Sequence, residues 1–159
     1  MWHKVLREVI IMQAKDFTSA NRAAWDQVAP LHRSQNHDRL LKAFSEPGYS
    51  CLNNIETTCL KALDIAGKDI AQICCNNGRE LMSVKNMGAG RCVGFDGSAG
   101  FVEQARDIAS KSKIECEFLC TDIYEISPAY YAGFDVVTIT IGVLSWMPEL
   151  DNFFAILFK

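Results

Sequence analysis

The segment from Lys68 to Asp96, KDIAQICCNNGRELMSVKNMGAGRCVGFD, constrains the fold more than any other part of the chain. Its first apolar run, residues 69–74, predicts a short strand that is buried on both faces. Residues 75–78 predict a tight turn, because Asn and Gly tolerate positive φ. Apolar residues then recur at helical spacing up to Gly88, and residues 91–95 predict a second strand. This pattern is half of a nucleotide-binding βαβ unit, whose ligand crevice lies above the carboxyl ends of the strands.

The turn between the first strand and the helix is poor in glycine. A dinucleotide site needs G-x-G-x-x-G, because the backbone must close on a pyrophosphate at the helix N-terminus. The turn here offers only Gly78, and the side chains before it would crowd a diphosphate. A ligand with a ribose and no phosphates fits better, and S-adenosylmethionine is the common one. Asp96 is predicted to accept both ribose hydroxyls; the alternative is a helix cap or a surface acid.

These residues resemble motif I and the acidic-loop motif of class I S-adenosylmethionine-dependent methyltransferases, in a bacterial branch with little-characterised substrates. Motif I usually reads as an acid, one residue and then G-x-G-x-G. Gln72 stands where the acid is expected, Cys74 and Asn76 replace the first two glycines, and Gly78 is kept. The resemblance implies S-adenosylmethionine as the cofactor. It also implies an α/β fold, a Rossmann-like doubly wound parallel sheet with N-terminal helices.

A third strand is predicted over residues 115–120, and Asp122 and Ile123 follow it. The resemblance implies that the acid accepts the adenine amino group and that the apolar residue packs on the ring; for Asp122, a loop cap is the alternative. The β-branched run at residues 134–141 predicts a fourth, central strand. The implied cofactor-binding residues are Cys74, Cys75, Asn76, Gly78, Asp96, Gly97, Ser98, Asp122, Ile123 and Thr140. Residues 143–146 would line the acceptor side.

Right-handed crossovers place these strands in the order 3-2-1-4. The resemblance implies later strands that the chain does not contain, so we expect residues 21–159 to be an incomplete methyltransferase domain and residues 1–20 to be an N-terminal extension. The unpaired edge of the fourth strand predicts either self-association into a homo-oligomer through this edge or a chain that is a fragment of a longer protein.

Two short helices are predicted before the sheet, at residues 21–27 and 37–44, with Pro30 closing the first. The resemblance implies that they form a lid, with Trp25, Leu31 and His32 near the pocket. The equally weighted alternative is that Trp25 only fastens the helix to the core. A further amphipathic helix is predicted to start near Cys51 and to pack on one face of the sheet.

The composition and charge of the chain limit the classes of partner that we expect. The net charge is −3 and no Lys/Arg cluster appears, so nucleic acid is not favoured. No apolar run approaches the roughly 18 residues that cross a membrane. The 7 cysteines form no C-x-x-C pair, which predicts free thiols in a cytoplasmic protein and no metal site.

The function predicted from the sequence is S-adenosylmethionine-dependent methyl transfer to a small-molecule acceptor. No triad, metal cluster or general base is evident, so catalytic residues stay unknown, and catalysis would come from holding donor and acceptor in near-attack geometry. Two alternatives stay open. One is a truncated, non-catalytic cofactor-binding module; the other is a nicotinamide-dependent oxidoreductase.

Overall fold

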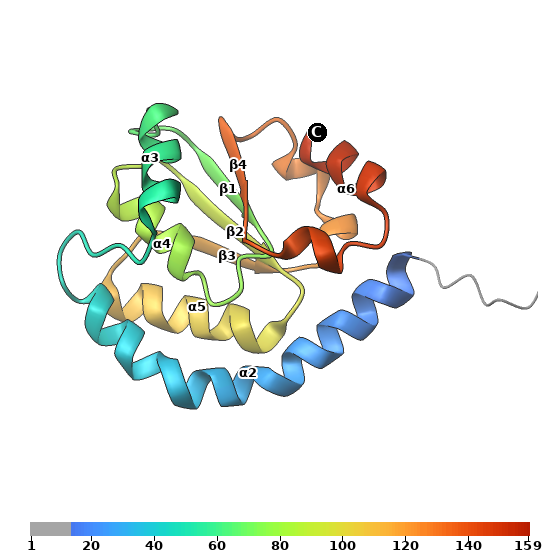
Figure 1. The fold of residues 1–159 in the computed structure, drawn as a ribbon, viewed down its shortest axis with the longest axis horizontal. Helices are drawn as coiled ribbons and strands as arrows, with labels where there is room; N and C mark the ends of the chain where they lie inside the picture. Colours follow the sequence, from blue (N-terminus) through green and yellow to red (C-terminus); the bar gives the residue numbers. More distant parts are fainter. Residues whose placement is uncertain (1–13) are drawn as a thin grey trace, which may run out of the picture.

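The computed structural model describes residues 14–159 and is built on one parallel sheet of four strands (Figure 1). Their order is β3-β2-β1-β4, which confirms the predicted topology. The strands are β1 (Ile70–Ile73), β2 (Cys92–Asp96), β3 (Glu117–Cys120) and β4 (Val136–Ile139).

The register of the sheet brings the strand ends together. Ile73, the last residue of β1, is aligned with Phe95 of β2 and with Ile139 of β4. All four strands are parallel, so the residues that follow them meet at one edge of the sheet.

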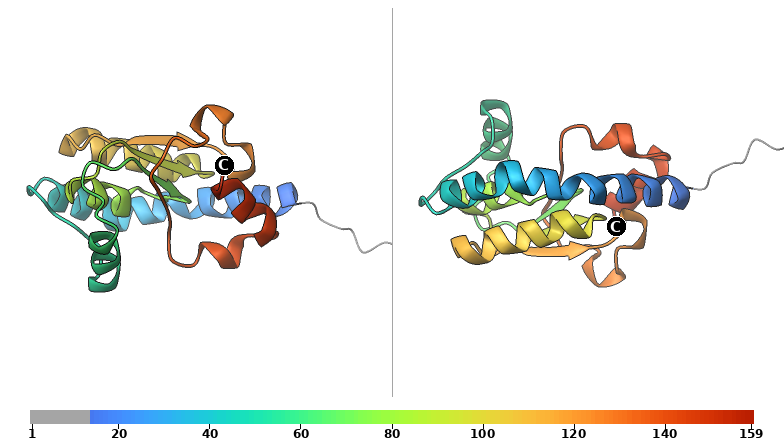
Figure 2. Two further views of the ribbon diagram at one scale, coloured as in Figure 1. Left: turned by 90° about the horizontal axis from the view of Figure 1, so that it is seen from above. Right: turned by 90° about the horizontal axis from the view of Figure 1, so that it is seen from below.

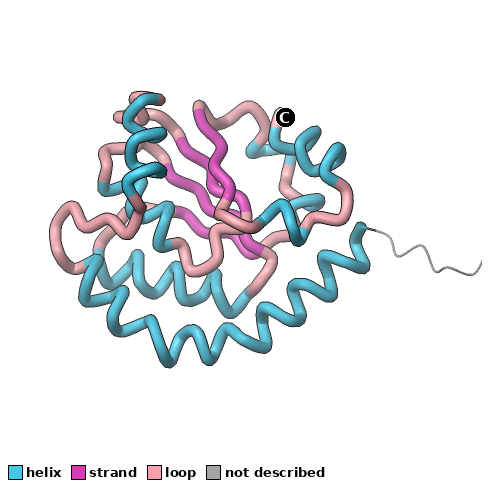
Figure 3. The backbone as a smooth tube through the Cα atoms, in the orientation of Figure 1, coloured by secondary structure: helices cyan, strands magenta, loops and turns pink. Residues whose placement is uncertain are grey.

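Helical elements cover both faces of this sheet (Figure 3). They are α2 (Ala14–Phe44), α3 (Asn54–Ala62), α4 (Arg79–Asn86), α5 (Ala99–Ser112), α6 (Leu150–Leu157) and the 3-10 turns η1 (Ile123–Glu125), η2 (Pro128–Tyr130) and η3 (Val143–Trp146). On one face, α2, α4 and α5 contribute Leu40, Leu81 and Ile108 to a buried core. On the other face, Val143 and Phe153 of η3 and α6 pack on the sheet. The two cores make the fold doubly wound, as predicted.

The prediction of two short N-terminal helices is wrong, because α2 is one helix of 31 residues with Pro30 inside it. Proline in a helix interior costs about 3 kcal/mol. The face of α2 that carries Ala29, Leu40 and Phe44 is buried, and this packing offsets that cost. Figures 1 and 2 show α2 running alongside α5. Gly100 allows the close approach, since a Cβ there would lie 2.7 Å from Cβ of Ala29.

The predicted boundary between an extension (1–20) and the domain (21–159) falls within α2 and stays a prediction. Residues 1–13 lie outside the described part of the chain. No described helix is both long and apolar enough to cross a membrane.

The helix predicted after Cys51 is present as α3, but the predicted apolar positions Ile55, Cys59 and Leu63 are exposed. Asn53 starts it with a capping box, accepting from the Glu56 backbone N–H at 3.0 Å while Glu56 accepts from the Asn53 N–H at 2.8 Å. Ile55 is 76% exposed, and only Leu60 of this helix is buried. Local capping therefore forms α3, which packs on the sheet less than its apolar spacing suggested.

A cluster of charged groups joins α2 to α5 around the Asp107 carboxylate. Asp107 Oδ2 accepts from Lys111 Nζ at 2.8 Å and from Nε2–H of the buried His37 at 2.7 Å, and Arg33 Nη2 lies 3.8 Å away. These contacts, with the Lys111 hydrogen bond first, hold the pKa of Asp107 below its usual value.

We expect this cluster to make the stability of the fold depend on pH. A carboxylate with a lowered folded pKa stabilises fully above its unfolded pKa of about 3.9, and that contribution is lost as pH falls through the lower folded value. Asp107→Asn should therefore flatten the fall in unfolding free energy from pH 5 down to pH 2.5, measured by urea denaturation. Asp38→Asn, on the exposed side of α2, is the control. An unchanged slope in Asp107→Asn would contradict the assignment.

The predicted self-association stays a prediction. Strand β4 pairs with β1 on one side, and no strand within residues 14–159 pairs with its other side. Val137 of β4 and Ile141, two residues after its end, are exposed, at 38% and 80%. We expect light scattering at micromolar concentration to show dimers or larger species, and Val137→Lys to shift them towards monomer. A wild-type chain that scatters as a monomer at every concentration would contradict this.

Candidate functional site

A cavity lies at the carboxyl ends of the strands, where the sequence placed it. Every predicted cofactor-binding residue except Cys75 and Gly78 lines it: Cys74, Asn76, Asp96, Gly97, Ser98, Asp122, Ile123 and Thr140. Val143 and Trp146, predicted for the acceptor side, line it as well. Residues of α2 and η3 complete the wall, among them Thr18, Asn21, Arg22, Trp25 and Met147.

Asp96, at the end of β2, is held by two backbone donors. Oδ2 accepts from the Asn76 N–H at 2.7 Å, and Oδ1 accepts from the Ser98 N–H at 2.9 Å. Burial raises the pKa of this carboxyl, and the two N–H groups oppose the rise. Each oxygen of an ionised carboxylate has two lone pairs, so each can still accept one hydroxyl from a ligand.

Asp26 of α2 holds the loop that follows Asp96. This role of Asp26 was not predicted from the sequence. Its Oδ1 accepts from Ser98 Oγ at 2.6 Å and from the Gly100 N–H at 3.2 Å. Ser98 also caps α5, with its Oγ accepting from the Phe101 N–H. The helical spacing of Asp26 from Thr18 and Arg22 was the available signal, but the predicted helix began at residue 21 and therefore left Thr18 out.

Asp122 and Ile123 come from the loop after β3. Asp122 Oδ1 accepts from the Tyr124 N–H at 3.0 Å and so begins η1. Asp122 therefore acts as a loop cap through Oδ1, as the alternative interpretation held, and it also lines the cavity. Ile123 is 7% exposed and offers the cavity an apolar surface.

The turn after β1 bends sharply to enter α4. Cys74 and Asn76 have φ of 54° and 51°, in the left-handed region that glycine favours, and Gly78 has φ of 72°. Burial, with the nearby carboxylates Asp96 and Asp122, raises the pKa of the Cys74 thiol to about 12, so this thiol is neutral. Cys74 and Asn76 therefore keep the left-handed backbone that glycine favours, although each carries a side chain.

Cys75 and Gly78 shape this turn without lining the cavity. Cys75 is 3% exposed and points into the core, against Gly94 of β2. A Cβ at Gly78 would overlap the Phe118 ring and lie 3.0 Å from Ala105 Cβ. These two positions therefore let α4 pack closely on the neighbouring elements.

Aromatic side chains close the cavity on the α2 side. The Trp25 ring lies 5.5 Å from the Trp146 ring and 5.9 Å from Phe101, both edge-on. Trp25 therefore both lines the cavity and fastens α2 to the core. The other two residues predicted near the pocket do not line it: Leu31 is 56% exposed, and His32 packs edge-on against Phe101.

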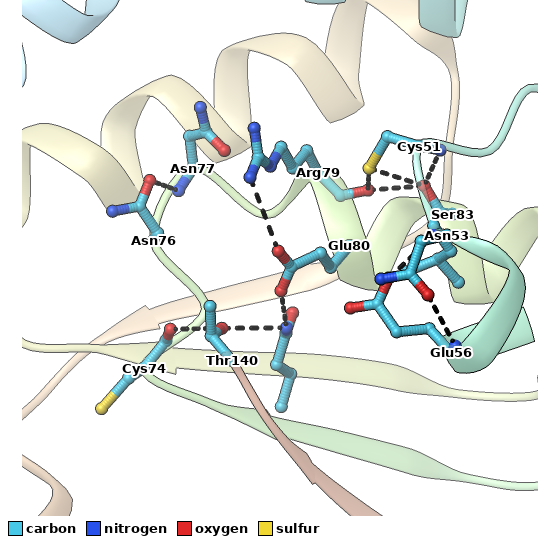
Figure 4. Close-up of polar contacts among 12 residues, drawn as sticks. Cys51, Asn53, Glu56, Cys74, Asn76, Asn77, Arg79, Glu80, Ser83 and Thr140 are labelled. Carbon is cyan, nitrogen blue, oxygen red and sulfur yellow. Dashed lines mark hydrogen bonds and ion pairs between the residues drawn. The ribbon is translucent and has the colours of Figure 1, made fainter. Parts of the chain in front are cut away.

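A buried hydrogen-bond network ends at the β1 side of the cavity (Figure 4). Gln72 Nε2 donates to Glu80 Oε2 at 2.9 Å and to Thr140 Oγ1 at 3.2 Å. Thr140 Oγ1 in turn donates to the Cys74 carbonyl at 2.9 Å. Glu80, in the first turn of α4, was not predicted to take part in the site.

Among the described residues, the cavity lining contains the carboxylates of Asp96 and Asp122 and the guanidinium of Arg22, but no histidine or lysine. Within residues 14–159, no three His, Cys, Asp or Glu side chains are placed to hold a metal ion. The geometry therefore suits recognition of a ligand that has hydroxyl and amine donors.

A family model described as a methyltransferase domain matches residues 70–159, from β1 to the end of the chain. The chain belongs to this methyltransferase domain family. No curated protein matches it in sequence.

Solved structures share the fold of this methyltransferase domain. A putative S-adenosylmethionine-dependent methyltransferase from Methanococcus maripaludis has a TM-score of 0.60 at 13% identity, covering 90% of the chain and 58% of its own. Phosphoethanolamine N-methyltransferase 1 of Haemonchus contortus has a TM-score of 0.64 at 13% identity, covering 92% and 29%. An S-adenosylmethionine-dependent methyltransferase from Mesorhizobium loti has 0.53 at 20% identity, covering 64% and 46%. The chain thus spans 29% to 58% of the length of these neighbours.

Proposed function

We propose that this chain binds S-adenosylmethionine in the cavity at the carboxyl ends of β1–β4 and serves methyl transfer to a small-molecule acceptor. The observation that carries the proposal is that Asp96, the last residue of β2, and Asp122, from the loop after β3, meet in one cavity. The family match supports it.

The adenosine half of the ligand fits the β2–β3 side. Asp96 has one lone pair on each oxygen left for a ribose hydroxyl, because each oxygen already accepts one backbone N–H. Asp122 Oδ2, which has no hydrogen-bond partner among the described residues, can accept from the adenine amino group, and Ile123 offers a surface for the ring.

The amino-acid half then lies at the β1 and β4 ends, between the Cys74–Asn76 turn and Thr140. Bound S-adenosylmethionine supplies a sulfonium methyl group that an acceptor can attack in line. The neighbouring wall is formed by Trp25, Trp146 and Met147 and is largely apolar. These residues orient the acceptor and exclude water, and such positioning supplies most of the rate increase.

We expect Asp122 to accept a hydrogen bond from the adenine amino group. Asp122→Ala should weaken S-adenosylhomocysteine binding roughly tenfold, since the lost hydrogen bond involves a charged group. Asp122→Asn should cost less, because its amide oxygen can still accept from that amino group or from the Tyr124 N–H. The measurement is isothermal titration calorimetry.

The control is a ligand in which oxygen replaces the adenine amino group. With this ligand, wild type and Asp122→Ala should bind within about twofold of each other, because the hydrogen bond is absent in both. If the deaminated ligand still distinguishes the two proteins, Asp122 does not contact that group.

A further inference from the structure

We propose that Gln72 and Glu80 are positioning residues that set the amino-acid end of the S-adenosylmethionine site, acting through Thr140 and the Cys74 carbonyl. The inference rests on the proposed function. It assigns a role to a carboxylate, Glu80, that does not itself line the cavity.

The directions of the hydrogen bonds follow from the chemistry of the groups. The Glu80 carboxylate only accepts, so the Gln72 amide must turn its nitrogen towards it. The same nitrogen donates its second hydrogen to Thr140 Oγ1. The Thr140 hydroxyl hydrogen is then left to donate to the Cys74 carbonyl, at 2.9 Å. Glu80 therefore fixes the orientation of every group in the network.

This arrangement leaves one buried polar atom of Gln72 without a hydrogen bond. Its side chain is 3% exposed, and its Oε1 is buried without a hydrogen-bond partner among the described residues. A flipped amide would place Oε1 against the Glu80 carboxylate, which is repulsive. The amide thus acts as a pure donor, and an acid at position 72 could not do so beside Glu80.

The network joins the turn after β1 to the end of β4, two parts of the cavity wall that this hydrogen-bond network holds in place. Cys74 has φ of 54°, which a residue with a side chain rarely adopts. Thr140 lies just past the end of the edge strand β4. The proposed adenosine contacts lie on the β2–β3 side. Weakening the hydrogen bond between Thr140 and the Cys74 carbonyl should therefore disturb only the amino-acid end of the ligand.

Binding of two ligands distinguishes effects on the amino-acid end from effects on the adenosine end. S-adenosylhomocysteine carries the amino-acid chain, whereas 5′-methylthioadenosine keeps the adenosine and the thioether and lacks the amino-acid group. Binding of both to the full chain is measured by calorimetry for wild type, Gln72→Met and Glu80→Gln. Gln104→Met is the matched control, because Gln104 is equally buried (2% exposed) and its amide holds Ala29 of α2 instead.

Gln72→Met should weaken S-adenosylhomocysteine binding by about tenfold and change 5′-methylthioadenosine binding by less than about twofold. Glu80→Gln should act in the same direction by about threefold, since its amide oxygen can still accept but carries no charge. Gln104→Met should change both affinities by the same factor. If Gln72→Met does not fold, Glu80→Gln carries the test.

Equal changes for both ligands in Gln72→Met and Glu80→Gln, or no change for either, would overturn the positioning role while the proposed function stands. A wild-type chain that binds neither ligand would overturn the proposed function and this inference with it.

Discussion

Replacing Asp96 with alanine should weaken the binding of S-adenosylmethionine by about 1.5–3 kcal/mol, the range for hydrogen bonds to a charged group. This corresponds to a loss of affinity of roughly 10- to 150-fold. The carboxylate is already oriented by the backbone N–H groups of Asn76 and Ser98, so no binding energy is spent on ordering it. Alanine removes the acceptors for both ribose hydroxyls at once.

The matched control is Asp135→Ala. Asp135 Oδ2 accepts from the Asp69 backbone N–H at 2.8 Å, at the opposite edge of the sheet. This variant also deprives a backbone N–H of its carboxylate, but it should leave the affinity within about twofold. Calorimetry on both variants, with circular dichroism to verify folding, makes the comparison. An affinity unchanged in Asp96→Ala would remove the ribose assignment.

Gly78→Ala should destabilise the fold by about 2–5 kcal/mol. Positive φ costs a residue with a Cβ about 1–2 kcal/mol. The new methyl group would also overlap the Phe118 ring in a packed core, and overpacking of this kind costs about 1–3 kcal/mol. Urea denaturation at neutral pH measures the change in unfolding free energy.

Gly67→Ala separates these two causes. Gly67 has φ of 73°, nearly that of Gly78, and nothing lies within 4 Å of a Cβ placed there. This control should lose only the backbone part, about 1–2 kcal/mol. Equal losses in the two variants would show that the contact with Phe118 does not matter and that Gly78 is required for its φ alone.

The sheet and the β2–β3 side of the cavity were predictable because their signals are local. Each strand is a short and mainly apolar run; Asp96 ends the second strand, and Asp122 lies two residues after the third. The parallel topology then brings these acids to one edge without any knowledge of distant contacts. Ser98 as the cap of α5 was likewise readable from adjacent residues.

The α2 side was not predictable in the same way. Pro30 is a strong local signal for a helix end, and only tertiary packing against α5 overrides it. The predicted first helix also began only at residue 21, so the common face of Thr18, Arg22 and Asp26 was not recognised. Glu80 was missed because its partner, Gln72, lies on a strand and its effect reaches the cavity through Thr140, which is distant in sequence.

The central claim is that the cavity at the strand ends binds S-adenosylmethionine. The most direct test is calorimetric titration of the full chain with S-adenosylhomocysteine, with NAD as the comparison ligand. We predict saturable binding of one S-adenosylhomocysteine per chain and no measurable binding of NAD. Binding of NAD without binding of S-adenosylhomocysteine would contradict the account.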